Sequence, residues 1–154
     1  MKTHALVDSP IGVLTLVEQD GALAGLYMEE HRHQPVIDGP RDDAALPEVQ
    51  EQLGAYFRRE LKEFDLQTST AGTTFQRLVW QALARIPYGE TWSYRRLAEE
   101  IGNPAAVRAV GLANGKNPLS IVVPCHRVVG ANGNLTGYGG GLHRKQWLLS
   151  LEQG

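Results

Sequence analysis

The stretch SYRRLAEEIGNPAAVRAVGLANG, residues 93–115, decides the fold class of the second half of this 154-residue chain. Ser93 is a good helix cap, and the helix that it would begin, YRRLAEEI, stops at Gly102-Asn103-Pro104. AAVRAVGLAN predicts a second short helix that ends at Asn114-Gly115. Two short helices joined by a tight glycine-containing turn are typical of a helix-turn-helix, although any helical hairpin shows the same pattern.

Longer elements flank this stretch. TFQRLVWQALARI, residues 74–86, predicts a helix that Pro87 and Gly89 end. Its expected buried face consists of the apolar residues Phe75, Leu78, Val79, Ala82, Leu83 and Ile86. A loop, GANGNLTGYGGG, occupies residues 130–141, and LHRKQWLLSLE, residues 142–152, predicts a last helix.

The first half of the chain predicts a small sheet followed by a helix. ALVDSPIGVLTLVEQDGALAGLYM, residues 5–28, is apolar and β-branched with turn signals at residues 9–10 and 20–21, which indicates a meander of about three strands. PEVQEQLGAYFRREL, residues 47–61, predicts a helix whose buried face carries Val49, Leu53, Phe57 and Leu61. The small and polar stretch LQTSTAGT, residues 66–73, is interpreted as a linker.

Charge divides the chain in the same way. Residues 1–71 hold 6 basic and 13 acidic side chains, a net charge of −7, and residues 72–154 hold 9 and 4, a net charge of +5. Opposite signs suggest two domains, of which the second faces an anionic partner, although scatter in a small sample gives the plainer explanation. The chain has no apolar segment of membrane-spanning length and no signal-peptide pattern, so we expect a cytoplasmic protein without a membrane partner.

Cys125 is the one cysteine of the chain and stands in IVVPCHRVVG, residues 121–130. Most lone cysteines are small buried hydrophobic side chains, and that interpretation stays open here. A His-Arg pair in the same run is costly to bury without partners, however, and a base or a cation nearby makes a thiol more reactive. In an extended chain Cys125 and His126 would point to opposite faces, so a turn or a bridging water must bring them together, with Glu152 available to orient the histidine.

These segments resemble the O6-alkylguanine-DNA alkyltransferases. The resemblance rests on IVVPCHRVVG, on Asn117-Pro118 before it, on GYGGGLHRKQWLLSLE after it and on the predicted helix-turn-helix, and it covers about residues 73–152. It implies an α+β fold. A ribonuclease-H-like N-terminal sheet-and-helix domain (residues 1–66) and a linker (67–72) would precede a mostly helical winged helix-turn-helix domain (73–154).

The resemblance implies direct-reversal DNA repair with one turnover per molecule. The protein would bind double-stranded DNA through the minor groove, flip out an O6-alkylguanine and transfer the alkyl group irreversibly to Cys125. O4-alkylthymine is a further lesion that the resemblance leaves open. His126 would take the thiol proton through a water, and Glu152 would hold His126. Asn117 would order the loop before the cysteine, and Tyr94 would donate a proton to the departing guanine.

The resemblance also implies two groups of binding residues. Arg108 would fill the gap that the flipped base leaves. The expected DNA-contacting residues are Arg108, Tyr94, Arg95, Asn103 and Ala131. The expected base pocket consists of Tyr138, Gly139, Val128 and Trp147. We expect no cofactor and no metal, and a monomer whose cooperativity on DNA is left open.

Three other functions fit parts of the pattern. A non-catalytic sensor of alkylated bases would share the fold but would lack the acceptor cysteine. A winged-helix regulator with a structural cysteine would need a more strongly charged recognition helix than AAVRAVGLAN. A cysteine hydrolase would need an oxyanion hole and repeated turnover.

Overall fold

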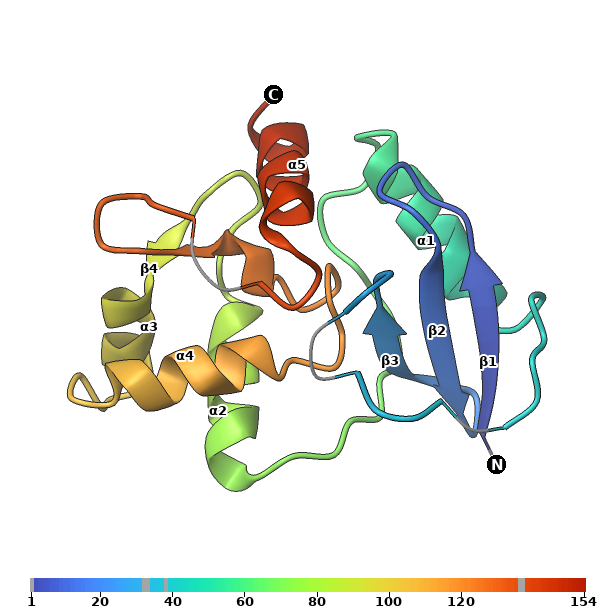
Figure 1. Ribbon diagram of the computed structural model, residues 1–154, viewed down its shortest axis with the longest axis horizontal. Coiled ribbons are helices and arrows are strands. Elements are labelled where there is room, and N and C mark those ends of the chain that lie inside the picture. The colour runs from blue at the N-terminus through green and yellow to red at the C-terminus, as the bar shows by residue number, and fades with distance from the viewer. Residues whose placement is uncertain (1, 32–33, 38, 136–137) are drawn as a thin grey trace.

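The computed structural model describes every residue except 1, 32–33, 38 and 136–137 (Figure 1). A three-stranded sheet and one helix form the N-terminal half, and short helices with a two-stranded sheet form the C-terminal half, which confirms the α+β class. The elements are β1 (Lys2–Val7), β2 (Leu14–Gln19), β3 (Ala22–Tyr27), α1 (Pro47–Phe57), α2 (Thr74–Leu83), β4 (Trp92–Ser93), α3 (Tyr94–Glu100), α4 (Val107–Gly115), the 3-10 turn η1 (Cys125–Arg127), β5 (Val128–Val129) and α5 (Leu142–Gln153).

The predicted meander is confirmed. β1, β2 and β3 pair antiparallel in sequence order. Asp20 and Gly21 connect β2 to β3 with φ values of 51° and 86°, and two positive φ values match the twist of a tight hairpin. Ala5 lies opposite Leu16 in the register, and both side chains are fully buried on the inner face of the sheet.

Helix α1 is shorter than predicted and turns a different residue inward. It ends at Phe57 rather than residue 61, and Arg59 just beyond it has a φ of 63°. Its buried residues are Val49, Leu53 and Tyr56, whereas Phe57 is only half-buried. The spacing of four and then three residues keeps one face of a helix toward the sheet better than a strict spacing of four.

The predicted linker is hydrogen-bonded to the N-terminal sheet. The backbone of Leu23 in β3 donates to the carbonyl of Gln67 (3.0 Å) and accepts from the amide of Ser69 (2.9 Å). Residues 67–69 therefore add backbone hydrogen bonds to the edge of β3 before the chain enters α2.

Helix α2 begins with a capping box between Thr73 and Gln76 and buries Val79, Ala82 and Leu83 as predicted. The prediction that Leu78 lies in the core is wrong, because its side chain is 46% exposed. Trp80 is buried instead, and its indole N–H donates to the Ala113 carbonyl of α4 over 2.9 Å. The buried side of α2 is therefore set by its packing against α4, which the spacing of apolar residues within α2 does not show.

The helix-turn-helix is formed by α3 and α4. Ser93 caps α3 by accepting a hydrogen bond from the amide of Arg96 (3.0 Å), as predicted. Gly102 has a φ of 77° in the connecting turn, a conformation that glycine adopts readily. α3, α4 and the loop of residues 130–135 lie at the same end of the molecule, on the left in Figure 1.

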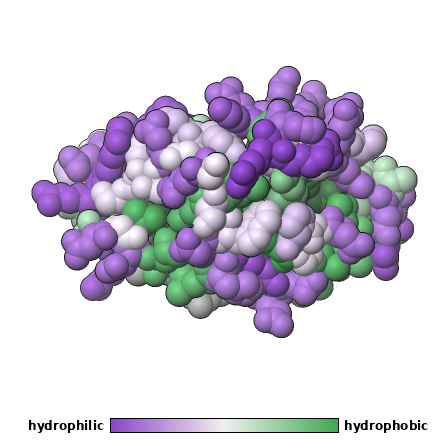
Figure 2. All heavy atoms as spheres, turned by 90° about the horizontal axis from the view of Figure 1, so that it is seen from above, coloured by the Kyte–Doolittle hydropathy of each residue, from purple (hydrophilic) through white to green (hydrophobic). Residues whose placement is uncertain are grey.

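The two halves pack against each other. The amide of Leu26 in β3 donates to the Pro118 carbonyl over 2.8 Å, and the guanidinium of Arg144 in α5 donates to the carbonyls of Ile11 (2.9 Å) and Glu29 (2.7 Å). A single cluster of buried apolar side chains includes residues from both halves. On the face seen in Figure 2, hydrophobic atoms form separate areas between hydrophilic ones. Among the described residues, every helix is too short or too polar to cross a bilayer.

Candidate active site

Cys125 begins the 3-10 turn η1, directly after Pro124. The turn replaces the extended backbone in which Cys125 and His126 would face opposite sides, so one of the two arrangements anticipated from the sequence is present. Both residues are buried: Cys125 is 5% exposed and His126 is fully buried. Bulk water is therefore largely excluded from both the thiol and the imidazole.

Glu152 of α5 is the centre of a buried hydrogen-bond network. Its Oε2 atom lies 2.7 Å from Nε2 of His126 and accepts from Nη2 of Arg127 (3.0 Å) and from the hydroxyl of Tyr56 (2.6 Å). Its Oε1 atom accepts from Nε of Arg127 (2.8 Å), and Nη1 of Arg127 donates to the Ile86 carbonyl (2.6 Å). The carboxylate thus has four donor contacts from three side chains.

The network fixes the tautomer of His126. An ionised carboxylate can only accept hydrogen bonds, so Nε2 of His126 must carry the proton that lies between it and Glu152. In a neutral imidazole the other nitrogen, Nδ1, then has a free lone pair. Nδ1 is buried and forms no hydrogen bond with any described residue. The ring is therefore oriented with its basic nitrogen available.

The charge states of the pair follow from burial and partners. Burial lowers the pKa of His126 and outweighs the opposing effect of Glu152, so the imidazole is neutral in the resting protein. Burial works to raise the pKa of Glu152, but the hydrogen bonds and charges of His126 and Arg127 outweigh it and lower that pKa to about 2. The pair is therefore a neutral base held by a permanent carboxylate.

Cys125 stands in a mixed environment. Burial raises the pKa of its thiol, while Asn117, Lys145 and Tyr138 act in the opposite direction. Lys145 is fully buried, and burial lowers its own pKa to about 8. A thiolate on Cys125 would accordingly be stabilised by one cation and by two polar side chains rather than by water.

Asn117 holds the loop that leads to Cys125. Its side-chain amide donates to the Val123 carbonyl (2.8 Å), and its side-chain oxygen accepts from the amide of Leu119 (3.0 Å). Within the loop, Ile121 has a φ of 73°, which is a strained conformation for a β-branched residue. Such strain persists only where the surroundings over-determine the backbone, and the two Asn117 hydrogen bonds are part of those surroundings.

The residues expected to form a base pocket differ in their surroundings. Val128 is fully buried and pairs with Trp92 between β5 and β4. Tyr138 is buried near enough to Cys125 to affect its pKa, whereas Gly139 is only half-buried. The Trp147 ring packs against Phe57 of α1, with centroids 5.9 Å apart.

The glycine-rich loop has a packing role of its own. A side chain at Gly140 would collide with Met28, which follows β3 in the N-terminal half. Thr136 and Gly137 of the same loop lie outside the described residues. At Gly140, the absence of a side chain therefore lets the loop backbone pack closely against the N-terminal half.

The expected DNA-contacting residues lie on the surface around α3 and α4. Arg108, Arg95, Asn103 and Ala131 are all exposed, and Tyr94 is half-buried at the start of α3. The ring of Tyr94 lies over Gly111 of α4 and within 6.0 Å of the ammonium group of Lys145. Tyr94 thus contacts α4 on one side and lies near the buried Lys145 on the other.

No role was predicted from the sequence for Tyr56 or Lys145, and Arg127 was considered only as a cation beside Cys125 that is costly to bury without partners. Tyr56 could have been found from the spacing of Val49 and Leu53, which continues to residue 56 on the same helical face. The buried residues of α5 are Lys145, Leu148, Leu149, Leu151 and Glu152, and all but Leu151 follow the spacing of one helical stripe. A lysine and a glutamate on an otherwise apolar stripe were a signal of a buried polar site.

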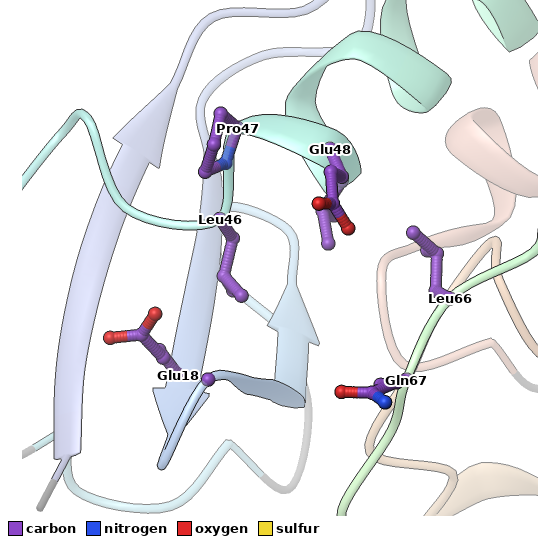
Figure 3. A pocket seen from close by; sticks show the side chains of 8 residues that line it. Glu18, Leu46, Pro47, Glu48, Leu66 and Gln67 are labelled. Carbon is purple, nitrogen blue, oxygen red and sulfur yellow. The ribbon is translucent and has the colours of Figure 1, made fainter.

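A separate pocket lies in the N-terminal half, far along the chain from Cys125. Figure 3 shows Glu18, Leu46, Glu48 and Leu66 around it, contributed by β2, the start of α1 and the segment after α1. None of its lining residues is a candidate site residue. Among the described residues there is also no cluster of three or more histidine, cysteine, aspartate or glutamate side chains that could hold a metal ion.

Comparison with known proteins assigns both halves of the chain. The sequence family described as "6-O-methylguanine DNA methyltransferase, ribonuclease-like domain" matches residues 2–70, and "6-O-methylguanine DNA methyltransferase, DNA binding domain" matches residues 74–154. A methylated-DNA–protein-cysteine methyltransferase of Mycolicibacterium paratuberculosis is 56% identical over 99% of this chain and 93% of its own length. The protein of the same name from Methanosarcina acetivorans is 48% identical over 97% of each chain.

Solved structures agree with these sequence matches. The crystal structure of Mycobacterium tuberculosis OGT in complex with DNA has a TM-score of 0.95 and 52% identity, over 98% of this chain and 93% of that one. The archaeal O6-methylguanine-DNA methyltransferase of Pyrococcus kodakaraensis, 24% identical over 99% of both chains with a TM-score of 0.71, shares the fold. With a family match in each half and relatives about half identical over more than nine-tenths of their length, this chain belongs to the 6-O-methylguanine DNA methyltransferase family.

Proposed function

We propose that Cys125 is the acceptor through which this protein reverses alkylation damage in DNA directly. The observation that carries the proposal is the neutral His126, held by Glu152 with Nδ1 as its basic nitrogen, next to the one cysteine of the chain. Family membership supports alkyl transfer and does not favour a non-catalytic sensor or a regulator with a structural cysteine.

The first step is removal of the thiol proton. His126 takes this proton at Nδ1, directly or through a water, and the carboxylate of Glu152 stabilises the imidazolium that results. Lys145 and the side chain of Asn117 stabilise the thiolate left on Cys125. Because burial disfavours both the thiolate and the imidazolium, forming them as a close pair costs less than forming either charge separately.

The second step moves the alkyl group. The sulfur attacks the carbon attached to O6 of guanine, a carbon–sulfur bond forms, and the carbon–oxygen bond breaks with its electrons going to the guanine. Tyr94 supplies a proton to the departing base and recovers one from solvent. The thioether on Cys125 is stable, and no second nucleophile is assigned to release it, so each molecule acts once.

The surface that receives DNA is proposed to be α3, α4 and the adjoining loop. Arg108 and Arg95 are exposed and form no ion pair with a described residue, whereas Arg96 lies over the Trp92 ring at 4.4 Å. Small residues on α4, such as Ala109 and Gly111, would let this helix approach the backbone of a minor groove closely. Arg108 would occupy the space that the flipped base leaves.

The remaining aspects of the proposal concern lesion and setting. The substrate is an alkylated guanine in double-stranded DNA, bound through the minor groove by a monomer. The protein would act in the cytoplasm, where the reducing environment keeps Cys125 as a free thiol.

The decisive experiment mixes the protein with a duplex that contains one O6-methylguanine. Trypsin should release residues 117–127 as the peptide that carries Cys125, because Lys116 and Arg127 bound it. We expect this peptide to gain one methyl group, in a stoichiometric and irreversible reaction that ends with unmodified guanine in the DNA. The matched control is Cys125→Ser with the same duplex.

Two results would contradict the proposal. Demethylation by the serine variant at the wild-type rate would show that another residue is the acceptor. Tight binding of the lesion with an unmodified Cys125 peptide would instead identify a damage sensor.

A further inference from the structure

Tyr56 is the one residue of the N-terminal half that hydrogen-bonds Glu152 in the described part of the chain. Its hydroxyl donates to Oε2 over 2.6 Å, and Oε2 is the same atom that lies 2.7 Å from Nε2 of His126. The two residues that meet are 96 positions apart in the sequence, on α1 and α5. One oxygen atom therefore connects the N-terminal half to the histidine beside Cys125.

The position of the Tyr56 hydroxyl is set by packing. The residue is fully buried, and its ring contacts those of Phe57, Phe64 and Tyr88, with centroids 5.4 to 6.3 Å apart. Burial and the neighbouring carboxylate raise the pKa of Tyr56, so the phenol keeps its proton throughout the pH range in which the protein folds. It is consequently a permanent donor to Glu152.

We propose that Tyr56 is a positioning residue for alkyl transfer, which acts through Oε2 of Glu152 to set the orientation and the basicity of His126. The inference rests on the proposed role of His126 as the base for Cys125. It gives the N-terminal half a part in the chemistry, beyond support for the DNA-binding half.

The direction of the effect follows from competition at one oxygen. A donor from Tyr56 draws electron density away from Oε2 and weakens its attraction for the proton on Nε2 of His126. Without that donor the carboxylate is more basic and favours the imidazolium form more strongly. His126 would then be protonated at a higher pH and would be less available as a base near neutrality.

The other charged groups around His126 remain in place when the Tyr56 hydroxyl is removed. They are Arg127 in its own turn and Glu152 and Lys145 of α5. Burial and the charge of Glu152 raise the pKa of Tyr88, so its hydroxyl stays protonated and adds no charge near His126. A change in pH dependence on removal of one hydroxyl can thus be assigned to Tyr56.

The experiment compares wild type with Tyr56→Phe, which keeps the ring contacts and removes only the donor. The quantity measured is the single-turnover rate of methyl transfer from an O6-methylguanine duplex to Cys125, from pH 5 to pH 9. We expect the acidic limb of the Tyr56→Phe profile to move to higher pH by about half a unit, which lowers the rate on that limb by about threefold. The matched control is Tyr88→Phe, which removes a hydroxyl from the same aromatic cluster and should keep the wild-type profile.

The outcomes separate the inference from the proposed function. An active wild type with an unchanged acidic limb in Tyr56→Phe would overturn the inference and leave the proposed function standing, even if the variant were less stable or uniformly slower. Failure of the wild type to methylate Cys125 would overturn both.

A second variant keeps the test informative if Tyr56→Phe does not fold. A ring-fluorinated tyrosine introduced at position 56 has a more acidic phenol and is a stronger donor in nearly the same volume. It should move the acidic limb to lower pH, opposite to the phenylalanine variant. An unchanged or upward-moving limb would overturn the inference.

Discussion

Arg127 and Glu152 form a two-point ion pair in the interior of the protein. Nε of Arg127 lies 2.8 Å from Oε1 and Nη2 lies 3.0 Å from Oε2, and the Glu152 side chain is fully shielded from solvent. The fork of a guanidinium matches both oxygens of a carboxylate, which lysine cannot do. Arg127 thereby fixes the orientation of the carboxylate that His126 contacts.

Loss of Arg127 should be strongly destabilising. Arg127→Met leaves the Glu152 charge buried with fewer donors, and breaking a buried pair in this way costs about 3–5 kcal/mol. The free energy of unfolding, measured by urea titration at pH 7, checks this expectation. Arg58→Met is the control, because Arg58 pairs with Glu60 at the surface and should change the stability far less. Similar small losses in the two variants would show that the buried pair does not hold the structure together.

Stability should fall in acid because of Glu152. Its pKa is lowered from 4.5 to about 2 in the folded protein, so its contribution is complete above pH 4.5 and is lost as the pH falls toward 2. The shift corresponds to roughly 3 kcal/mol between pH 5 and pH 2. Unfolding free energies of wild type and Glu152→Gln should therefore converge over that interval. Parallel curves would contradict a depressed Glu152 pKa.

The sequence predicted those parts of the site that depend on local pattern. The turn signals at Asp20 and Gly21 and the cap at Ser93 act over a few residues, and both are present as predicted. The resemblance carried by Cys125, His126 and Glu152 placed the last two in contact, and they are hydrogen-bonded. These predictions depended either on residues close together in the sequence or on a family motif whose contacting residue is known.

Long-range packing accounts for what the sequence did not predict. Leu78 looked like a core residue, but the direction in which α2 meets α4 leaves it exposed and buries Trp80. Tyr56 and Lys145 are polar residues on apolar helical stripes, and their partners come from distant segments. A pattern within one helix shows which face is buried, but it does not show what that face meets.

Lys145 should accelerate the reaction by favouring the thiolate of Cys125. Lys145→Met removes the cation that lowers the thiol pKa, so transfer at pH 7 should slow by about tenfold. Because the pKa of Lys145 itself is about 8, wild type loses the same advantage at higher pH and the two rates should converge. The measurement is the rate of alkyl transfer from free O6-benzylguanine between pH 6 and pH 9.5.

The control for Lys145 is Lys62→Met, which removes an exposed lysine near Tyr88 and should leave the pH profile unchanged. A constant ratio between wild type and Lys145→Met at every pH would show that Lys145 acts through packing rather than charge.

Arg108 should matter for DNA and not for the chemistry at Cys125. It is exposed on α4, and it is proposed to fill the space of the flipped base while it also meets phosphate charge. Arg108→Ala should therefore slow transfer from an O6-methylguanine duplex by about tenfold or more, yet leave transfer from free O6-benzylguanine unchanged. Arg58→Ala, which changes an exposed arginine after α1, is the control for loss of surface charge.

Arg108→Lys separates the two parts of that role. Lysine keeps the charge that contacts phosphate but lacks the planar group that can stack in place of a base. If stacking matters, the lysine variant should bind undamaged duplex with the wild-type salt dependence and still transfer slowly from damaged duplex. Recovery of the full rate by lysine would reduce Arg108 to a phosphate contact, and an equal loss on free O6-benzylguanine would show that α4 is coupled to the cysteine itself.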